Sequence, residues 1–107
     1  MPTVFFLARL REGVTPEAYE QWVRSFDYPT AQSIPSILSY KTHRIVGPYR
    51  QAATPYDYIE VVEITNIDDY RRDLAELPQA QELRRPIVAY LEPSDSYWGH
   101  LMEDRRS

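Results

Sequence analysis

The chain has 107 residues, which is long enough for one small domain with a single hydrophobic core and too short for two. Its 43% hydrophobic and 26% charged residues are typical of globular proteins, and its net charge of −4 gives no attraction to nucleic acid or anionic membranes, which need concentrated Lys and Arg. Because it contains no cysteine, disulfides, thiolate metal sites and thiol nucleophiles are excluded.

No apolar run approaches the ~20 residues that a membrane-spanning helix needs, and the first residues lack the basic start and cleavage site of a signal peptide. We therefore expect one domain over residues 1–107, located in the cytoplasm. Nine Tyr, two Trp and three Phe favour amphipathic surfaces around a cavity or a subunit interface.

The first half of the chain predicts a strand, a helix, a loop and a second strand. Thr3–Leu10 is a continuous run of β-branched, aromatic and apolar residues, which indicates a buried strand. Thr15 and Pro16 are an N-cap and a first helical residue, and the apolar positions that follow have helical spacing: Tyr19, Trp22, Val23 and Phe26. The segment from Asp27 to Ser36 has two prolines and is predicted as a loop, followed by a strand from about Ile37 to Val46.

The second half predicts two strands that flank an interrupted helix. Tyr58–Ile64 alternates in the manner of a strand. Asn66 caps a helix that Pro78 interrupts, and a continuation runs from about Gln79 to Leu91 before Pro93 ends it. The last strand is expected at about Ser96–Met102, and the charged tail from Glu103 to Ser107 is expected to fray.

The resulting β-α-β-β-α-β order predicts an α+β, ferredoxin-like fold, in which an antiparallel sheet carries both helices on one face. The first and third strands are the most apolar and should be central, while the second, with Lys41 and His43, should be an edge strand. The uncovered face of such a sheet needs a partner, so we expect a homodimer in the form of a dimeric α/β barrel.

Strand alternation separates the polar candidates into faces. In the third strand Tyr58 and Glu60 share one face, which we expect to be the uncovered one, because a helix-covered face should reject a carboxylate in mid-strand. The predicted mixed face carries the candidate binding and catalytic residues Tyr58, Glu60, Trp98, His100, Lys41 and His43.

A histidine near a carboxylate is the minimum for acid–base catalysis at neutral pH, so His43, His100 and Glu60 are the candidate catalytic residues. Each of these residues also has a non-catalytic interpretation, since histidines on edge strands are often solvated and Glu60 could form a salt bridge across a dimer interface. Tyr58, Trp98 and Lys41 are the candidate substrate-binding residues, although aromatic side chains on a sheet face are as often interface core. We expect no metal and no cofactor, because no metal-ligand spacing or glycine-rich phosphate loop is present.

The sequence resembles the RedY/HapK-like proteins of prodiginine-type pigment pathways. The resemblance covers most of the chain and rests on Val4–Leu10, on the block Tyr56–Ile64 with Asp68-Asp69-Tyr70 after it, and on the last strand with Trp98. It implies a dimeric ferredoxin-like protein that acts on a pyrrole- or indole-derived intermediate in natural-product biosynthesis. The implied step is a cyclisation or dehydration without a redox cofactor.

Three functions compete at this point. The first is a cofactor-independent cyclase that holds a small aromatic substrate against Trp98 and Tyr58 while ionisable groups move protons. The second is a non-catalytic protein that binds and delivers a reactive aromatic intermediate. The third is a cofactorless monooxygenase, suggested by analogy of fold alone.

Overall fold

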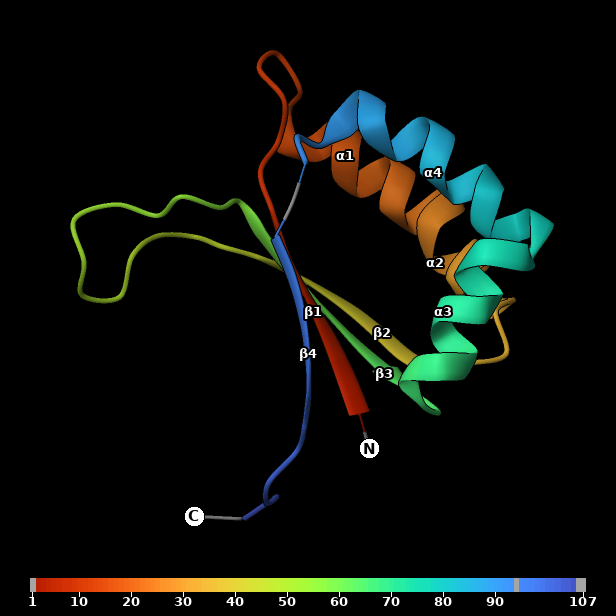
Figure 1. The fold of residues 1–107 in the computed structure, drawn as a ribbon. Coiled ribbons are helices and arrows are strands. Elements are labelled where there is room, and N and C mark those ends of the chain that lie inside the picture. Colours follow the sequence, from red (N-terminus) through yellow and green to blue (C-terminus); the bar gives the residue numbers. More distant parts are fainter. Residues whose placement is uncertain (1, 94, 106–107) are drawn as a thin grey trace.

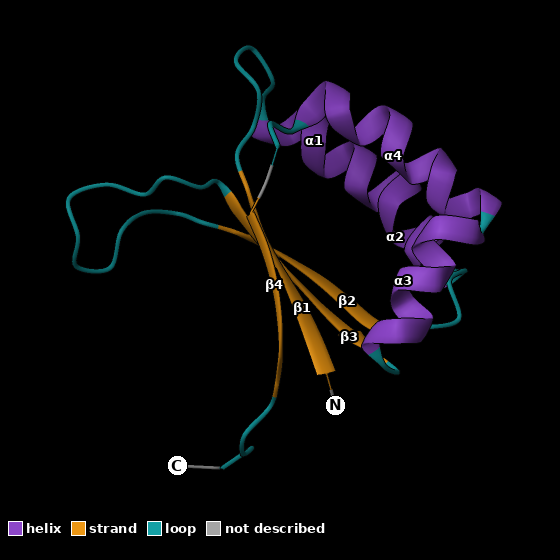
Figure 2. Ribbon diagram, in the orientation of Figure 1, coloured by secondary structure: helices purple, strands orange, loops and turns teal. Residues whose placement is uncertain are grey.

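The computed structural model describes residues 2–93 and 95–105 and has the expected β-α-β-β-α-β order (Figure 1). Its four strands form one antiparallel sheet in the order β2-β3-β1-β4, with the helices gathered on one side (Figure 2). The predicted ferredoxin-like fold and the central position of the first and third strands are confirmed. The strands are β1 (Pro2–Ala8), β2 (Ile37–Arg44), β3 (Tyr58–Ile64) and β4 (Asp95–His100).

The first helical region is longer than predicted. It consists of α1 (Pro16–Trp22), the π-helical turn η1 (Val23–Asp27) and α2 (Tyr28–Gln32), so the prediction of a loop from Asp27 to Ser36 is wrong for residues 27–32. In η1 the Tyr28 N–H donates to the carbonyl of Val23, five residues back. This wider turn precedes Pro29, whose ring would crowd the previous turn of a regular α-helix and which has no N–H to donate. The chain can therefore stay helical through a proline.

The second helical region divides at Pro78, as predicted. Helix α3 (Ile67–Glu76) begins after Asn66, whose side chain accepts from the Asp69 N–H, and α4 (Pro78–Tyr90) begins at the proline. Leu77 between them is extended, with φ −75° and ψ 132°. A helix interrupted in this way bends around the sheet, so α3 and α4 both contribute to one cavity wall.

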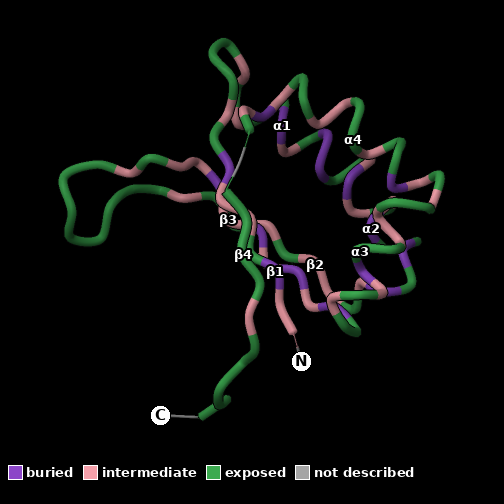
Figure 3. The backbone as a smooth tube through the Cα atoms, in the orientation of Figure 1, coloured by how far each residue is buried: buried purple, intermediate pink, exposed green. Residues whose placement is uncertain are grey.

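Burial alternates strictly along β3, and it reverses the predicted assignment of faces. Tyr58, Glu60, Val62 and Ile64 are buried, whereas the residues between them are only partly covered. The buried set faces the helices, because Glu60 bonds to Tyr19 of α1. The prediction that Tyr58 and Glu60 lie on the uncovered face is therefore wrong. Figure 3 shows the buried positions along the strands and helices and the largely exposed β2–β3 loop.

The core consists of two apolar clusters under the helices. One joins α1 and the end of α4 to Ala8 and Tyr58, and the other joins α3 to Val4, Val62 and Ile64. Glu60 lies between them along β3. Within the described residues no helix is long and apolar enough to cross a membrane. Residues 103–105 of the predicted tail are exposed and irregular, and so are residues 101–102, where the last strand was predicted to continue; residues 106–107 lie outside the described residues.

Candidate functional site

Glu60 is a buried carboxyl in the middle of a central strand. Its neighbours across the sheet are Phe6 of β1 and Thr42 of β2, and the residue is 4% exposed. The Tyr19 hydroxyl donates to Glu60 Oε1 at 2.7 Å, and the Tyr40 hydroxyl lies 2.9 Å from Glu60 Oε2. Burial raises the pKa of Glu60, and the two tyrosine hydrogen bonds counteract part of that rise. The tyrosines thus make this position tolerable for a carboxylate.

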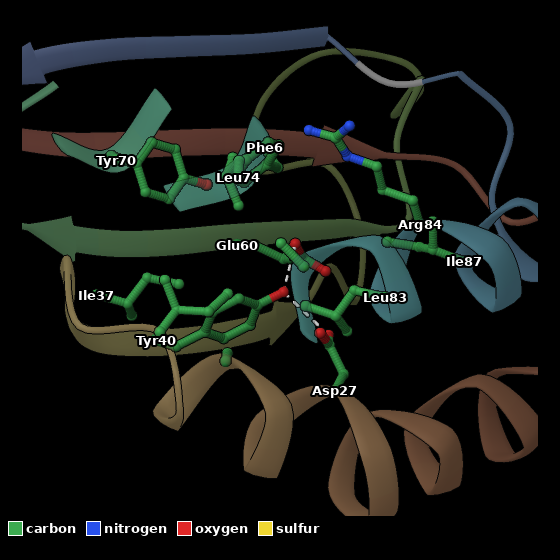
Figure 4. Close-up of a pocket in the computed structure, with 13 residues that line it drawn as sticks. Phe6, Asp27, Ile37, Tyr40, Glu60, Tyr70, Leu74, Leu83, Arg84 and Ile87 are labelled. Carbon is green, nitrogen blue, oxygen red and sulfur yellow. Dashed lines mark hydrogen bonds between the residues drawn. The ribbon is translucent and has the colours of Figure 1, made fainter. Parts of the chain in front are cut away.

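A second buried carboxyl, Asp27, shares one of these tyrosines. Asp27 is the last residue of η1 and is 1% exposed, and its Oδ2 lies 3.0 Å from the Tyr40 hydroxyl (Figure 4). Burial, followed by the charge of Glu60, raises the pKa of Asp27 to about 7. Figure 4 shows Tyr40 between the two carboxyl groups; we call these two carboxyls, together with the Tyr40 that bridges them, the acid pair.

Hydrogen-bond geometry indicates which carboxyl holds the proton. A phenolic hydroxyl has one proton to donate, so Tyr40 cannot donate to both carboxylates. Glu60 has a second donor in Tyr19, whereas Tyr40 is the side-chain partner of Asp27. A carboxylate with two donors is the better stabilised one, and burial and the charge of Glu60 raise the pKa of Asp27. We therefore assign the ionised form to Glu60, which accepts from Tyr40, and the proton to Asp27, which donates to Tyr40.

The tyrosines themselves stay neutral. Burial is the largest cause raising the pKa of both Tyr19 and Tyr40 well above the usual tyrosine value, and the charge of Glu60 adds to it. The acid pair is therefore the group that can exchange a proton near neutral pH, with Tyr40 as the bridge between its two carboxyls.

A cavity of about 160 Å³ opens beside the acid pair (Figure 4). Apart from the acid pair its polar lining residues are Tyr70 of α3 and Arg84 of α4, and the remainder is apolar. An apolar cavity with a few polar groups is typical of sites for small organic ligands. The described residues contain no group of three side chains able to hold a metal ion. The apolar lining residues are Phe6, Ala31, Ile34, Ile37, Leu74, Ala80, Leu83 and Ile87.

The structure does not bring the two histidines to the acid pair. His43 and Lys41 of β2 pair with Ile59 and Val61, so they lie on the uncovered face, opposite Glu60, and both are exposed. The prediction that all six candidates share one face is therefore wrong for these two. His100 lies on the same side of the sheet as Glu60, but it is exposed at the end of edge strand β4. A single cavity containing His43, Glu60 and His100 is thus not present.

The two aromatic candidates, Tyr58 and Trp98, also lie in different parts of the structure. Tyr58 is buried, and its hydroxyl donates to Glu20, which also pairs with Arg44, away from the cavity. Trp98 is 45% exposed and lines an outer hollow between α3 and β4. That hollow and the cavity share Phe6, Tyr70 and Leu74, so Trp98 is the predicted binding residue that lies near the cavity.

Sequence reasoning missed Asp27, Tyr19 and Tyr40 as site residues. Asp27 had a visible signal, because it lies four residues after Val23 and eight after Tyr19, in line with the apolar stripe of the helix. A carboxyl on such a stripe must be paired or protonated once buried. Tyr19 and Tyr40 had no comparable signal, since tyrosines at these positions also serve as ordinary core residues.

A family model described as REDY-like protein HapK matches residues 2–102 of the chain. The crystal structure of HapK from Hahella chejuensis is similar over 100% of this chain and 98% of that chain, with a TM-score of 0.81 and 27% sequence identity. A comparison with curated protein sequences finds no match.

Two further solved structures share the fold at lower identity. The hydroxynitrile lyase from Passiflora edulis has a TM-score of 0.77 and 16% identity, covering 98% of this chain and 96% of that chain. A dimeric ferredoxin-like protein of unknown function from Thermobifida fusca YX has a TM-score of 0.68 and 22% identity, covering 94% of this chain and 90% of that chain. Proteins of this fold thus include an enzyme and a dimer.

Proposed function

The chain belongs to the family of REDY-like HapK proteins, and we propose that it is a cofactor-independent enzyme of prodiginine-type natural-product biosynthesis. In this proposal it is a cyclase that acts on a pyrrole- or indole-derived aromatic intermediate by general acid–base catalysis. The observation that carries the proposal is the placement of two buried carboxyls, both within hydrogen-bond distance of the Tyr40 hydroxyl, at the wall of an apolar cavity.

The acid pair can supply both proton transfers of a cyclisation. Protonated Asp27 gives its proton to a carbonyl oxygen of the substrate while a ring carbon attacks the carbonyl carbon, so that a C–C bond forms and the oxygen becomes a hydroxyl. Ionised Glu60 then takes the proton from the attacking ring carbon and restores the aromatic ring. Tyr40 returns that proton to Asp27, which leaves the pair as it began. In a dehydration, the same acid would protonate the departing hydroxyl.

The cavity would supply proximity and exclusion of water. Its apolar walls exclude water from one face of a flat ring, and the acid pair lies at the edge of the space that the ring would fill. Such positioning removes much of the entropic part of a barrier. Trp98 in the adjoining hollow would contact a part of the substrate that extends beyond the cavity.

The test is turnover of the pathway intermediate by purified wild-type protein and by Asp27→Asn and Glu60→Gln. Each variant should lose roughly 10²-fold or more in rate while ligand affinity is retained. Glu82→Gln, which removes an exposed carboxyl from α4, is the matched control and should keep the wild-type rate. Wild-type rates in both acid-pair variants would refute the proposal. Binding without conversion would favour a delivery protein, and oxygen consumption would favour a monooxygenase.

We also propose that the protein is a homodimer through the uncovered sheet face. Large apolar side chains on that face have no helix over them, and Phe5 and Tyr97, which pair across β1 and β4, are 38% and 63% exposed. Light scattering should give about 25 kDa, twice the chain mass of 12.6 kDa. A mass of one chain at micromolar concentration would contradict the proposal.

A further inference from the structure

Two polar groups on the cavity wall take no part in the acid–base proposal. Tyr70 of α3 is 7% exposed, and Figure 4 shows its hydroxyl directed into the cavity. Arg84 of α4 is exposed and lines the same cavity, and its side chain extends toward β1, away from the acid pair (Figure 4).

Neither group has a partner in the part of the chain that the structure describes. The Tyr70 side chain is largely buried, but its hydroxyl makes no hydrogen bond there and is accessible, since the buried side-chain oxygens without a partner among those residues are those of Ser36 and Thr42. Arg84 makes no hydrogen bond or ion pair with those residues either. The two are electrostatic neighbours: burial and the charge of Glu60 raise the pKa of Tyr70 to about 12, and the charge of Arg84 opposes that rise. Tyr70 is thus a neutral donor beside a permanent cation.

We propose that the cavity binds a flat aromatic carboxylate, whose carboxylate accepts hydrogen bonds from the Tyr70 hydroxyl and the Arg84 guanidinium. A guanidinium fork and a hydroxyl are matched donors for an ionised carboxylate. The ring would lie against Phe6, Leu74 and Leu83, which line the same cavity as these donors and the acid pair. This inference deepens the proposed function, on which it rests for the use of this cavity, by naming a charged group on the substrate.

Size and charge both support this class of ligand. The cavity of about 160 Å³ compares with cavities of about 150 Å³ that hold benzene, so it accommodates one aromatic ring. An anion near Glu60 would be repelled, but Arg84 points away from the acid pair and so holds the carboxylate at a distance from it. The opposite edge of the ring then faces Asp27 and Glu60, where proton transfer would take place.

The experiment is calorimetric titration with two probes of equal shape, benzoate and the uncharged benzamide. Wild-type protein should bind benzoate more tightly than benzamide. Arg84→Gln should weaken benzoate binding by about tenfold or more and leave benzamide nearly unchanged, because hydrogen bonds to charged groups are the stronger ones. Arg85→Gln is the matched control, since Arg85 is the next residue of α4, is exposed and does not line the cavity. Tyr70→Phe should also weaken benzoate binding.

Any of three results would overturn the inference. Wild-type protein could bind the two probes with equal affinity, it could bind neither probe, or Arg84→Gln and Arg85→Gln could lose benzoate affinity equally. Asp27→Asn separates this result from the proposed function, because it should lose turnover and still prefer benzoate. Loss of turnover in Asp27→Asn without any benzoate preference would overturn only the carboxylate inference. A benzoate preference with wild-type turnover in Asp27→Asn would overturn only the acid–base proposal.

Discussion

The buried acid pair should make the stability of the protein fall as pH rises through the weakly acidic range. Asp27 has a pKa of about 7 in the folded protein, against an ordinary value of 3.8. Between these values the native state keeps a proton that the unfolded state has released, so protonation favours folding at low pH. The contribution of Asp27 is therefore fully present below about pH 4 and is lost as pH rises to about 7.

The size of this effect follows from the change in pKa. A difference of about 3 pKa units corresponds to about 4 kcal/mol, since each unit is worth about 1.4 kcal/mol. Solvent screening does not reduce this contribution to stability, because Asp27 is 1% exposed. The raised pKa of Glu60 also makes stability fall as pH rises. Because Glu60 is present in both wild type and Asp27→Asn, the difference in stability between these two proteins isolates the contribution of Asp27.

The assay is urea denaturation of wild-type protein and Asp27→Asn between pH 4 and pH 8, followed by tryptophan fluorescence, since Trp22 is in the core. At fixed protein concentration, Asp27→Asn should gain stability relative to wild type by about 4 kcal/mol across this range. Asp68→Asn, which removes an exposed carboxyl from α3, controls for the loss of one acidic side chain. A constant difference between wild type and Asp27→Asn at every pH would refute the assignment of the proton to Asp27.

Three further predictions concern the surroundings of the acid pair. Tyr19→Phe should lower the free energy of unfolding by about 1–3 kcal/mol in urea denaturation at pH 8, because the buried glutamate loses a donor, whereas Tyr49→Phe at an exposed site should not. His43→Ala and His100→Ala should each keep wild-type turnover, so a large loss in either would restore the prediction of a catalytic histidine. Val61→Asp on the uncovered face should halve the mass measured by light scattering, and an unchanged dimer would place the interface elsewhere.

The order of elements could be predicted because it rests on local signals. The alternating pattern of Tyr58–Ile64, the cap at Asn66 and the break at Pro78 each act over a few residues, and all three appear in the structure. Strand ends were less well predicted: β1 ends at Ala8 rather than Leu10, whose N–H donates to the Asp57 side chain instead of continuing the ladder. Such a contact joins residues 47 positions apart and leaves no local pattern.

The burial of Glu60 could not be predicted, although alternation grouped it correctly with Tyr58. The expectation that a helix-covered face rejects a carboxylate holds only where no donor reaches it. Here Tyr19 and Tyr40, which are 41 and 20 positions away in the sequence, supply the donors. Asp27 was missed for a different reason: it continues the apolar stripe of the first helix, but Pro29 favoured a loop, and the π-helical turn that lets the helix continue past the proline was not expected.

The acid pair lowers the stability of a fold that does not depend on it. Two carboxyls that share one phenolic hydroxyl under the helices cost desolvation free energy, and apolar side chains of similar volume would fill the same space without that cost. Residues that reduce stability in this way are typical of sites kept for function. The cost also explains the chemistry, because the burial that destabilises the carboxylates raises the Asp27 pKa to about 7, where a proton can be both given and taken at neutral pH.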